Sequence, residues 1–334
     1  MRLPAFVFLR SQPRRVRVVA ITVLVAAAAT VPSFASAPTL SFATIVLIYV
    51  GLAVSLDLVW GYTGILSLGH AAFFGLGAYT VGLAARGGAP PQLAVLAPLA
   101  FFGGIVAGIV IGTFLFAGRR VMTIIYVAIA TLALSFIAER SLAVWHYVGA
   151  STGISGLPLP RLLGWRIVTP NDFYLLALGF AVLSYAVCRA VVSSPLRMVL
   201  TGIRVNEQRL QFLGYRTARF KVTVFAVSGG IAAVSGAIYA AVLGFASPTF
   251  FGIALSTLAM IWVLVGGPGT LLGPALGVVL VQYGSRVLSD RLLGWWQVAL
   301  GVLLLLVVLF FRHGLAGLLR REAVLELPGE GRAR

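Results

Sequence analysis

The sequence is nearly devoid of cysteine, lysine and acidic residues. Cys188 is the only cysteine among 334 residues, which excludes a disulfide framework and a cysteine-rich metal site. Lys221 is the only lysine, and it follows Phe220 rather than glycine, which excludes a Walker A loop. The three histidines are far apart and the eight carboxylates do not cluster, so no metal site is predicted. We therefore expect a chain without catalytic residues, without a cofactor of its own and without an ATPase site.

Charge is scarce and mostly of one sign. Only 10% of the residues are charged whereas 60% are hydrophobic, so a water-soluble fold is not expected. The formal net charge of +17 raises the question of nucleic acid, but the arginines lie between apolar runs instead of on a polar domain. This distribution is typical of the loops of a polytopic membrane protein, so membrane lipid is the expected surrounding and no nucleic-acid partner is predicted.

The apolar runs predict an all-α transmembrane protein. A helix needs about 20 apolar residues to cross a bilayer. Arginine pairs, Pro/Gly clusters and polar runs divide the chain into about ten spans, with eight as the lower limit. They cover 16–35, 40–60, 62–85, 92–117, 121–147, 172–192, 221–245, 253–267, 270–288 and 294–311. The third is glycine-rich and the eighth is short, so both are expected to be broken or re-entrant helices.

The arginines orient these spans. With a cytoplasmic N-terminus, 19 of the 25 basic residues fall on the cytoplasmic side, as the positive-inside rule requires. We therefore expect both termini in the cytoplasm, as a basic tail (1–15) and a C-terminal tail (312–334). A single transmembrane domain (16–311) lies between them. Alternatively, residues 1–37 are a cleaved signal peptide ending in an A-x-A site.

The segment after Leu56 is the most unusual. Small residues there allow close backbone approach, and a few polar groups lie at membrane depth. They are Gly61, Tyr62, Gly64, Ser67, Gly69, His70, Gly75 and Gly77. One interpretation is a tight contact between helices. The other is a broken helix whose freed polar groups line a substrate path.

Asp57 lies near the predicted cytoplasmic end of the second span. An ionisable group within a span is costly unless it is paired or functional, so Asp57 is either a local structural partner or part of a gate. Close to it, residues 61–66 read G-x-x-G-x-L, and residues 266–271 repeat this pattern at another predicted cytoplasmic junction. The two turns are a possible internal repeat.

The cytoplasmic insert 193–220 is amphipathic. Leu200, Ile203, Leu210 and Leu213 recur at helical spacing among arginines, which predicts one or two short amphipathic helices against the inner face. Gly214 provides a helix stop. The insert is either an interfacial helix whose arginines meet lipid headgroups or a docking helix for a soluble partner.

Six motifs, taken in order, resemble one family: the membrane subunits of ABC importers for branched-chain amino acids, the LivH/LivM permeases, with their urea-transport relatives. The resemblance covers about 41–318. Its carriers are GYTGILSLGHAAFFGLGAYT (61–80), TGISGLP (152–158), IRVNEQRLQFLGY (203–215), SGGIAAVSGAIYA (228–240), SPTFFG (247–252) and VGGPGTLLGPALG (265–277).

The resemblance implies a transport subunit of the bacterial inner membrane that works by alternating access. Its implied partners are a second permease subunit, two cytoplasmic ATPase subunits that hold ATP and magnesium, and an extracytoplasmic substrate-binding protein. The family's ATPase-coupling helix matches 203–215. Its motif positions are Arg204, Asn206, Glu207, Leu213 and Gly214.

The substrate stays open at this point. Arg209 and Leu210 replace the paired alanines of many amino-acid permeases, and DLVWGYTG (57–64) looks like the urea branch. In contrast, GASTGISGLP (149–158) looks like the amino-acid branch. Few fixed charges lie within the spans, which fits a neutral or zwitterionic solute such as a branched-chain amino acid, urea or a short amide. An ion-coupled secondary transporter is the alternative from another class.

Overall fold

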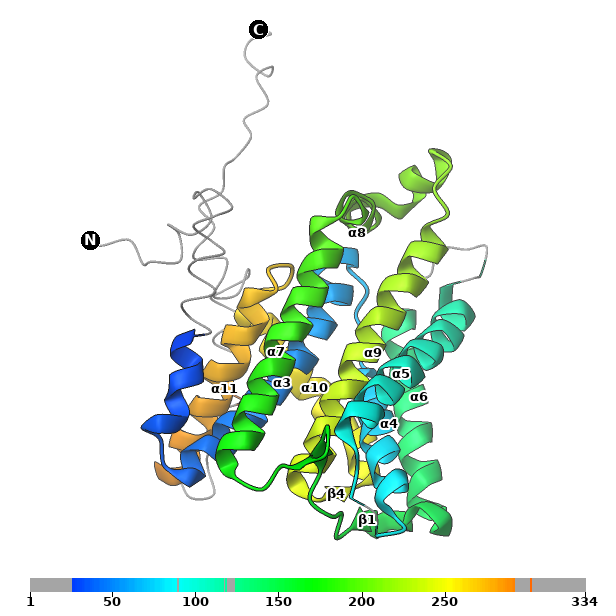
Figure 1. Ribbon diagram of the computed structural model, residues 1–334. Helices are drawn as coiled ribbons and strands as arrows, with labels where there is room; N and C mark the ends of the chain where they lie inside the picture. The colour runs from blue at the N-terminus through cyan, green and yellow to red at the C-terminus, as the bar shows by residue number, and fades with distance from the viewer. Residues whose placement is uncertain (1–25, 89, 117, 119–123, 292–300, 302–334) are drawn as a thin grey trace, which may run out of the picture.

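The computed structural model describes residues 26–88, 90–116, 118, 124–291 and 301. Within these residues the chain is a bundle of helices that run between two ends (Figure 1). One end carries α8 (Leu196–Phe212) and is called the α8 end below. The opposite end carries the short strands β1 (Ile154–Ser155) and β4 (Phe245–Ala246).

Five helices are long and apolar enough to cross a membrane. They are α3 (Ala37–Thr63), α5 (Leu93–Phe116), α6 (Ile124–Val144), α7 (Pro170–Ser193) and α9 (Thr217–Leu243). Two shorter apolar helices and a third, more polar one complete the set: α4 (His70–Ala85), α10 (Ile253–Gly266) and α11 (Leu272–Arg291). These helices coincide with the predicted spans two to nine. The chain is therefore a multi-pass helical membrane protein.

The structure does not describe the rest of the predicted segments in full. Span ten and the two tails lie outside the described residues, apart from residue 301, and so does the first part of span one. The count of ten spans and the cytoplasmic location of both termini stay predictions.

Short elements join the helices away from α8. Four 3-10 turns lie at η1 (Val31–Ser33), η2 (His146–Val148), η3 (Ala150–Thr152) and η4 (Pro248–Phe251). Strand β1 pairs antiparallel with β4, and β2 (Arg161–Leu162) pairs antiparallel with β3 (Trp165–Arg166). The prediction of an all-α chain missed these strands because two residues are too few to show the alternation of a strand.

Local sequence explains where several helices begin and end. α7 starts with a capping box, in which the Thr169 hydroxyl accepts from the Asp172 amide and the Asp172 carboxylate accepts from the Thr169 amide. α3 ends at Gly64, whose φ of 77° lies in the left-handed region that glycine adopts without strain.

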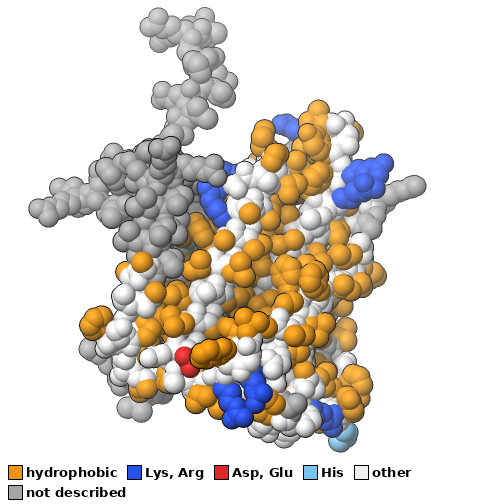
Figure 2. Space-filling model, viewed as in Figure 1, with side chains coloured by type: hydrophobic (Ala, Val, Ile, Leu, Met, Phe, Trp, Pro, Cys, Tyr) orange, Lys and Arg blue, Asp and Glu red, His pale blue; other side chains and the backbone are white. Residues whose placement is uncertain are grey.

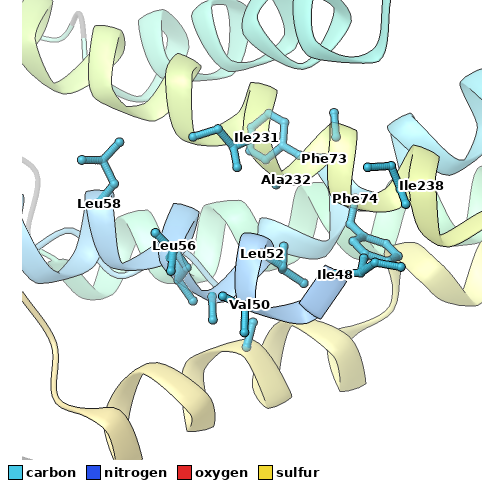
Figure 3. Packing of buried hydrophobic residues seen from close by; sticks show 14 of the residues in the cluster. Ile48, Val50, Leu52, Leu56, Leu58, Phe73, Phe74, Ile231, Ala232 and Ile238 are labelled. Atoms are coloured by element: carbon cyan, nitrogen blue, oxygen red, sulfur yellow. The ribbon is translucent and has the colours of Figure 1, made fainter. Parts of the chain in front are cut away.

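The core of the bundle is the contact of α9 with α3, α4 and α5. Figure 3 shows apolar side chains of α3, α4 and α9 pointing toward one another, among them Leu52, Phe74 and Ile231. Of the most apolar stretch of each helix, 72% is buried in α3 and α9 but only 22% in α5 and α6. The outer helices therefore offer apolar faces to lipid or to another subunit. Figure 2 shows hydrophobic side chains over the helix faces and most basic ones toward the two ends.

The predicted helical insert is present as α8, which is divided into two parts by a kink. α8 ends at Phe212, and Gly214 follows with a φ of 87°, so the predicted helix stop is confirmed. Leu200 and Ile203 are buried as expected. Leu213 is 73% exposed. The backbone leaves the helical conformation at Asn206, so the insert consists of two helical parts, one of the two arrangements that its sequence allowed.

Candidate functional site

The glycine-rich segment between α3 and α4 is broken, as predicted. Residues 64–69 are not helical, and α4 begins at His70. Ser67 and His70 have no exposed surface, and Tyr62, at the end of α3, is also buried. The Leu68 amide donates to the Thr131 hydroxyl of α6 at 3.1 Å. A side chain of another helix thus satisfies part of the backbone that the break frees.

His70 is held by two serines from other helices. Its Nε2 lies 3.0 Å from the Ser55 hydroxyl and 3.2 Å from the Ser228 hydroxyl. Both hydroxyl protons are used elsewhere, since Ser55 donates to the Leu52 carbonyl at 2.7 Å and Ser228 donates to the Ser55 carbonyl. Nε2 must therefore be the donor, which leaves Nδ1 of the neutral ring as an acceptor. Nδ1 has no hydrogen-bond partner.

The Ser67 hydroxyl is the second unsatisfied group of this segment. It is buried and, like His70 Nδ1, has no hydrogen-bond partner. A buried polar atom without a partner costs about 1–3 kcal/mol, so two of them within four residues need an explanation. The broken segment therefore carries one free acceptor and one free hydroxyl.

Most of the predicted small residues make close contacts between elements. A methyl group on Gly69 would overlap the Thr131 backbone, and one on Gly75 would overlap the Phe251 ring. A methyl group on Gly77 would overlap the Ala233 backbone of α9. For these three positions the structure shows the tight packing that small residues permit in membranes.

Asp57 binds the loop between α10 and α11. Its Oδ1 accepts from the Gly269 amide at 2.6 Å and its Oδ2 from the Leu271 amide at 2.9 Å. The carboxylate is fully buried, and Gly61 lies directly against Gly269. The two G-x-x-G-x-L turns, 205 residues apart in the sequence, therefore meet at the α8 end. Asp57 thus has local structural partners, while a gating role stays a prediction.

α8 consists of two parts that meet at Asn206. The φ of −161° and ψ of 96° at Asn206 are extended, and its Oδ1 accepts from the Arg209 amide at 3.0 Å. This is the geometry of an N-cap, so Asn206 begins a new helical part after the break. Just before it, the Arg204 guanidinium donates to the Gly61 carbonyl at the end of α3.

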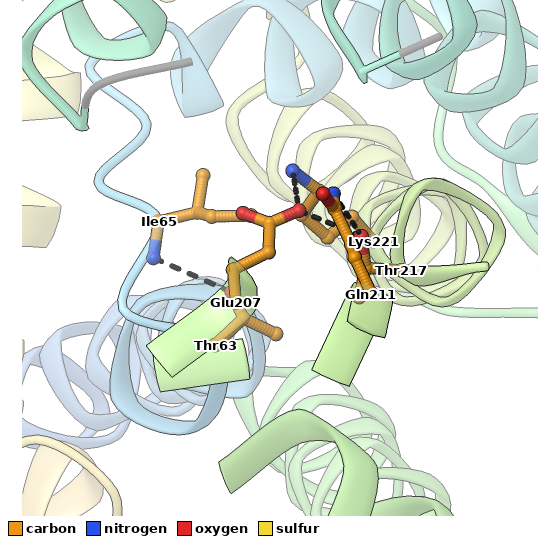
Figure 4. Close-up of polar contacts among 6 residues, drawn as sticks. All are labelled: Thr63, Ile65, Glu207, Gln211, Thr217 and Lys221. Atoms are coloured by element: carbon orange, nitrogen blue, oxygen red, sulfur yellow. Dashed lines mark hydrogen bonds and ion pairs between the residues drawn. The ribbon is translucent and has the colours of Figure 1, made fainter. Parts of the chain in front are cut away.

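Glu207 ties the second part of α8 to α9. Figure 4 shows its carboxylate facing Lys221 and Thr217, which lie next to each other. The Lys221 Nζ lies 2.7 Å from Oε1, and the Thr217 hydroxyl donates to the same oxygen at 2.8 Å. Gln211 extends the network by donating to the Thr217 hydroxyl at 3.1 Å. The side chains of Lys221 and Glu207 are only 6% and 12% exposed, so this ion pair is shielded from water.

The core helices, the broken segment and the kinked α8 all lie within one stretch of the chain that matches a known protein family. The family described as "Branched-chain amino acid transport system / permease component" matches residues 39–311. The chain belongs to this permease family.

The relatives of the permease agree with this assignment. It is 29% identical over 319 residues to the high-affinity branched-chain amino acid transport system permease protein LivM of Escherichia coli K12, covering 88% of this chain and 74% of LivM. The LivM protein of Salmonella typhimurium matches to the same extent. The autoinducer 2 import system permease protein LsrC of Salmonella paratyphi B is 29% identical over 67% of this chain and 65% of LsrC. No solved structure matches significantly.

The permease exposes apolar side chains on and beside α8. The exposed fraction is 81% for Met198, 79% for Val205 and 91% for Phe212. Leu213 and Gly214, both predicted coupling positions, are exposed beside them. Hydrophobic side chains are visible at this end in Figure 2. We call Met198, Val205, Phe212 and Leu213 the α8 apolar patch.

Several residues that hold the predicted site together were missed by the sequence analysis. Ser55, Ser228 and Thr131 satisfy the broken segment, and Lys221 satisfies Glu207. Ser228 lies in one of the motifs that carried the family resemblance, but its distance of 158 residues from His70 hides the contact. Among the described residues no group of three or more His, Cys, Asp or Glu is arranged to hold a metal ion.

Proposed function

We propose that the chain is a membrane subunit of an ATP-driven importer that moves branched-chain amino acids inward across the bacterial cytoplasmic membrane. The match of the permease family over 39–311 carries this proposal. The similarity to LivM over 88% of the chain supports the substrate class. ATP and Mg²⁺ bind to two partner ATPase subunits, because this chain lacks a Walker A loop. Both termini and α8 then lie in the cytoplasm.

We infer the partner subunits from the permease family, and the docking site of the ATPase from the exposed side chains of α8. A second permease subunit completes a heterodimer, and an extracytoplasmic binding protein delivers the solute. The ATPase docks on the α8 apolar patch, because the family's coupling helix matches 203–215 and apolar side chains on and beside this stretch are exposed. This favours the docking interpretation of the insert, although its arginines also suit contacts with lipid headgroups.

Phe212→Ala tests the docking surface. Phe212 is 91% exposed, so its truncation leaves the fold of the permease intact. An aromatic anchor of an interface costs about 2 kcal/mol or more when it is truncated, which corresponds to an affinity for the ATPase that is about 30-fold weaker. The measurement is the affinity of purified ATPase for the permease pair in nanodiscs. Exposed Arg189 of α7 supplies the control variant, Arg189→Ala, which should bind normally.

The substrate path runs along the segment from Gly61 to Gly77 in this proposal. The free Nδ1 of His70 and the free Ser67 hydroxyl support it, because an amino acid carries both donors and acceptors. In the described conformation both atoms are buried, so the path requires the alternate state of the transport cycle. Gly69 allows the close approach of the Thr131 backbone, and Gly64 that of the Arg204 side chain, so both glycines keep the segment close to its neighbours.

Reconstituted transport tests the function and separates it from its alternatives. The permease pair, the ATPases and the binding protein are placed in proteoliposomes and supplied with labelled leucine. Uptake should require ATP hydrolysis and should be unaffected by 100-fold excess urea. Competition by urea would instead support the urea or short-amide branch, which otherwise stays a prediction.

The second part of this experiment measures leucine uptake with an ion gradient and without ATP. Uptake driven by a proton or sodium gradient alone would contradict the proposal and favour a secondary transporter. A secondary transporter usually places a cluster of carboxylates at its ion site. Among the described residues no group of three or more His, Cys, Asp or Glu gathers in this way, and Asp57 is engaged by two backbone amides.

A further inference from the structure

Three elements distant in the sequence meet at one point of the α8 end: the end of α3, the α10–α11 loop and α8. The carboxylate of Asp57 accepts from two amides of the loop, those of Gly269 and Leu271. Hydrogen bonds to an ionised acceptor are about twice as strong as neutral ones, and these are shielded from water. The φ of 59° at Leu271 is unusual for leucine, which shows that the surrounding structure fixes this loop tightly. These contacts join the end of α3 to the loop, and the two together are called the joined body below.

Arg204 makes the polar contact between α8 and the end of α3. Its guanidinium donates to the Gly61 carbonyl, one turn beyond Asp57, and its side chain also packs against Gly64. Asp57 is buried, whereas Arg204 is exposed. A partly solvated hydrogen bond is weaker than a buried one and is readily replaced by water. Of the two sets of contacts, that of Arg204 is therefore the more easily exchanged for water, and those of Asp57 the less.

The second part of α8 is attached to a different helix, α9. Glu207 is paired with Lys221 and Thr217 of α9 in surroundings that exclude water. Asn206, with its extended backbone, separates this attachment from that of Arg204. The two parts of α8 thus contact different helices on either side of a break in the helix. A continuous helix would force both attachments to move together.

We propose that Arg204 is the positioning residue that transmits movement of α8 to the joined ends of α3 and the α10–α11 loop, with Asp57 holding that joined body together. Glu207 transmits the movement of the second part of α8 to α9, and Asn206 is the joint between the two routes. The inference rests on the proposed ATP-driven function. It adds to that function a route from the ATPase contact to the junction that flanks the broken segment 64–69.

The test compares Arg204→Gln with Arg204→Lys in the complete transporter. Both are reconstituted in proteoliposomes with their partner subunits, and leucine uptake and ATP hydrolysis are measured in the same sample. Glutamine removes the charge and shortens the donor, whereas lysine keeps a charged donor. We expect Arg204→Gln to lower the number of leucines moved per ATP at least tenfold while ATP hydrolysis continues, and Arg204→Lys to regain part of that ratio. Arg197→Gln, an exposed arginine on the same helix, should keep the wild-type ratio.

Asp57→Asn provides an independent variant of the same link. It keeps the size of the side chain, but its Nδ2 cannot accept from a backbone amide, so one of the two contacts is lost. The ratio should therefore fall as it does in Arg204→Gln. If Asp57→Asn fails to assemble, the Arg204 variants decide the matter on their own. An unchanged ratio in Arg204→Gln would overturn the inference. So would a loss of uptake that strictly parallels a loss of bound ATPase, because Arg204 would then serve docking.

Failure of the proposed function gives a different result. In that case the wild-type transporter itself shows no ATP-dependent leucine uptake. The inference fails alone if the wild-type transporter works and the Arg204 and Asp57 variants transport leucine with the wild-type ratio.

Discussion

Glu207→Ala should destabilise the permease by about 3–5 kcal/mol, because removal of one partner of a buried ion pair leaves the other charge uncompensated. Lys221 would be left with a 6% exposed side chain and without its carboxylate. The Phe116 ring, 4.9 Å from Nζ, offers only a cation–π contact, which replaces a small part of the loss. Thermal unfolding of the detergent-purified permease pair measures the effect.

A double variant separates the ion pair from the loss of packing. Glu207→Met combined with Lys221→Met replaces both charges with apolar side chains of similar size, which is often neutral for stability. We therefore expect the double variant to unfold near the wild-type temperature, although the attachment of α8 through Thr217 is lost and uptake stays impaired. Gln208→Ala, at an exposed neighbouring position, should change neither property. Unaltered unfolding of Glu207→Ala would show that Lys221 reaches water or another partner.

Gly77→Ala should destabilise the contact of α4 with α9 by about 3 kcal/mol, near the upper limit for an inserted methyl group. The new methyl group would overlap the Ala233 carbonyl, and backbone relieves an overlap less readily than a flexible side chain. Gly236 of α9 makes the reciprocal contact with the Phe74 backbone, so the two helices cannot separate at one position without disturbing the other. The yield of folded protein and its unfolding temperature should both fall.

Gly179→Ala is the matched control for this variant. Gly179 lies in α7, and no atom lies within 4 Å of the position of its new methyl group. Alanine is a better helix former than glycine, so this variant should be neutral or slightly more stable. Equal stability of Gly77→Ala and Gly179→Ala would mean that α4 and α9 are farther apart in the membrane than they are here.

The sequence showed where the functional segments lie, but it did not show which residues they contact. The high density of glycine at 61–77 marked this segment in the sequence. It was compatible both with tight helix packing and with a substrate path. The structure assigns Gly69, Gly75 and Gly77 to contacts with Thr131, Phe251 and Ala233. Their partners lie on other elements, and no local pattern specifies such a pairing.

α8 illustrates the same limit. The sequence predicted an amphipathic insert with a stop at Gly214, and both are present. It did not predict the break at Asn206, because asparagine is tolerated within a helix and becomes an N-cap only where the chain changes direction.

The sequence by itself determined that the protein is a multi-pass helical membrane protein of the permease family. Membrane insertion depends on the length and apolar character of each segment, and both are local properties. Only the tertiary structure decided that Asp57 holds the α10–α11 loop, that Arg204 reaches Gly61 and that Glu207 pairs with Lys221. A polar group buried within a helical bundle takes its partner from whichever helix packs beside it, and that neighbour is set by the packing of the whole bundle.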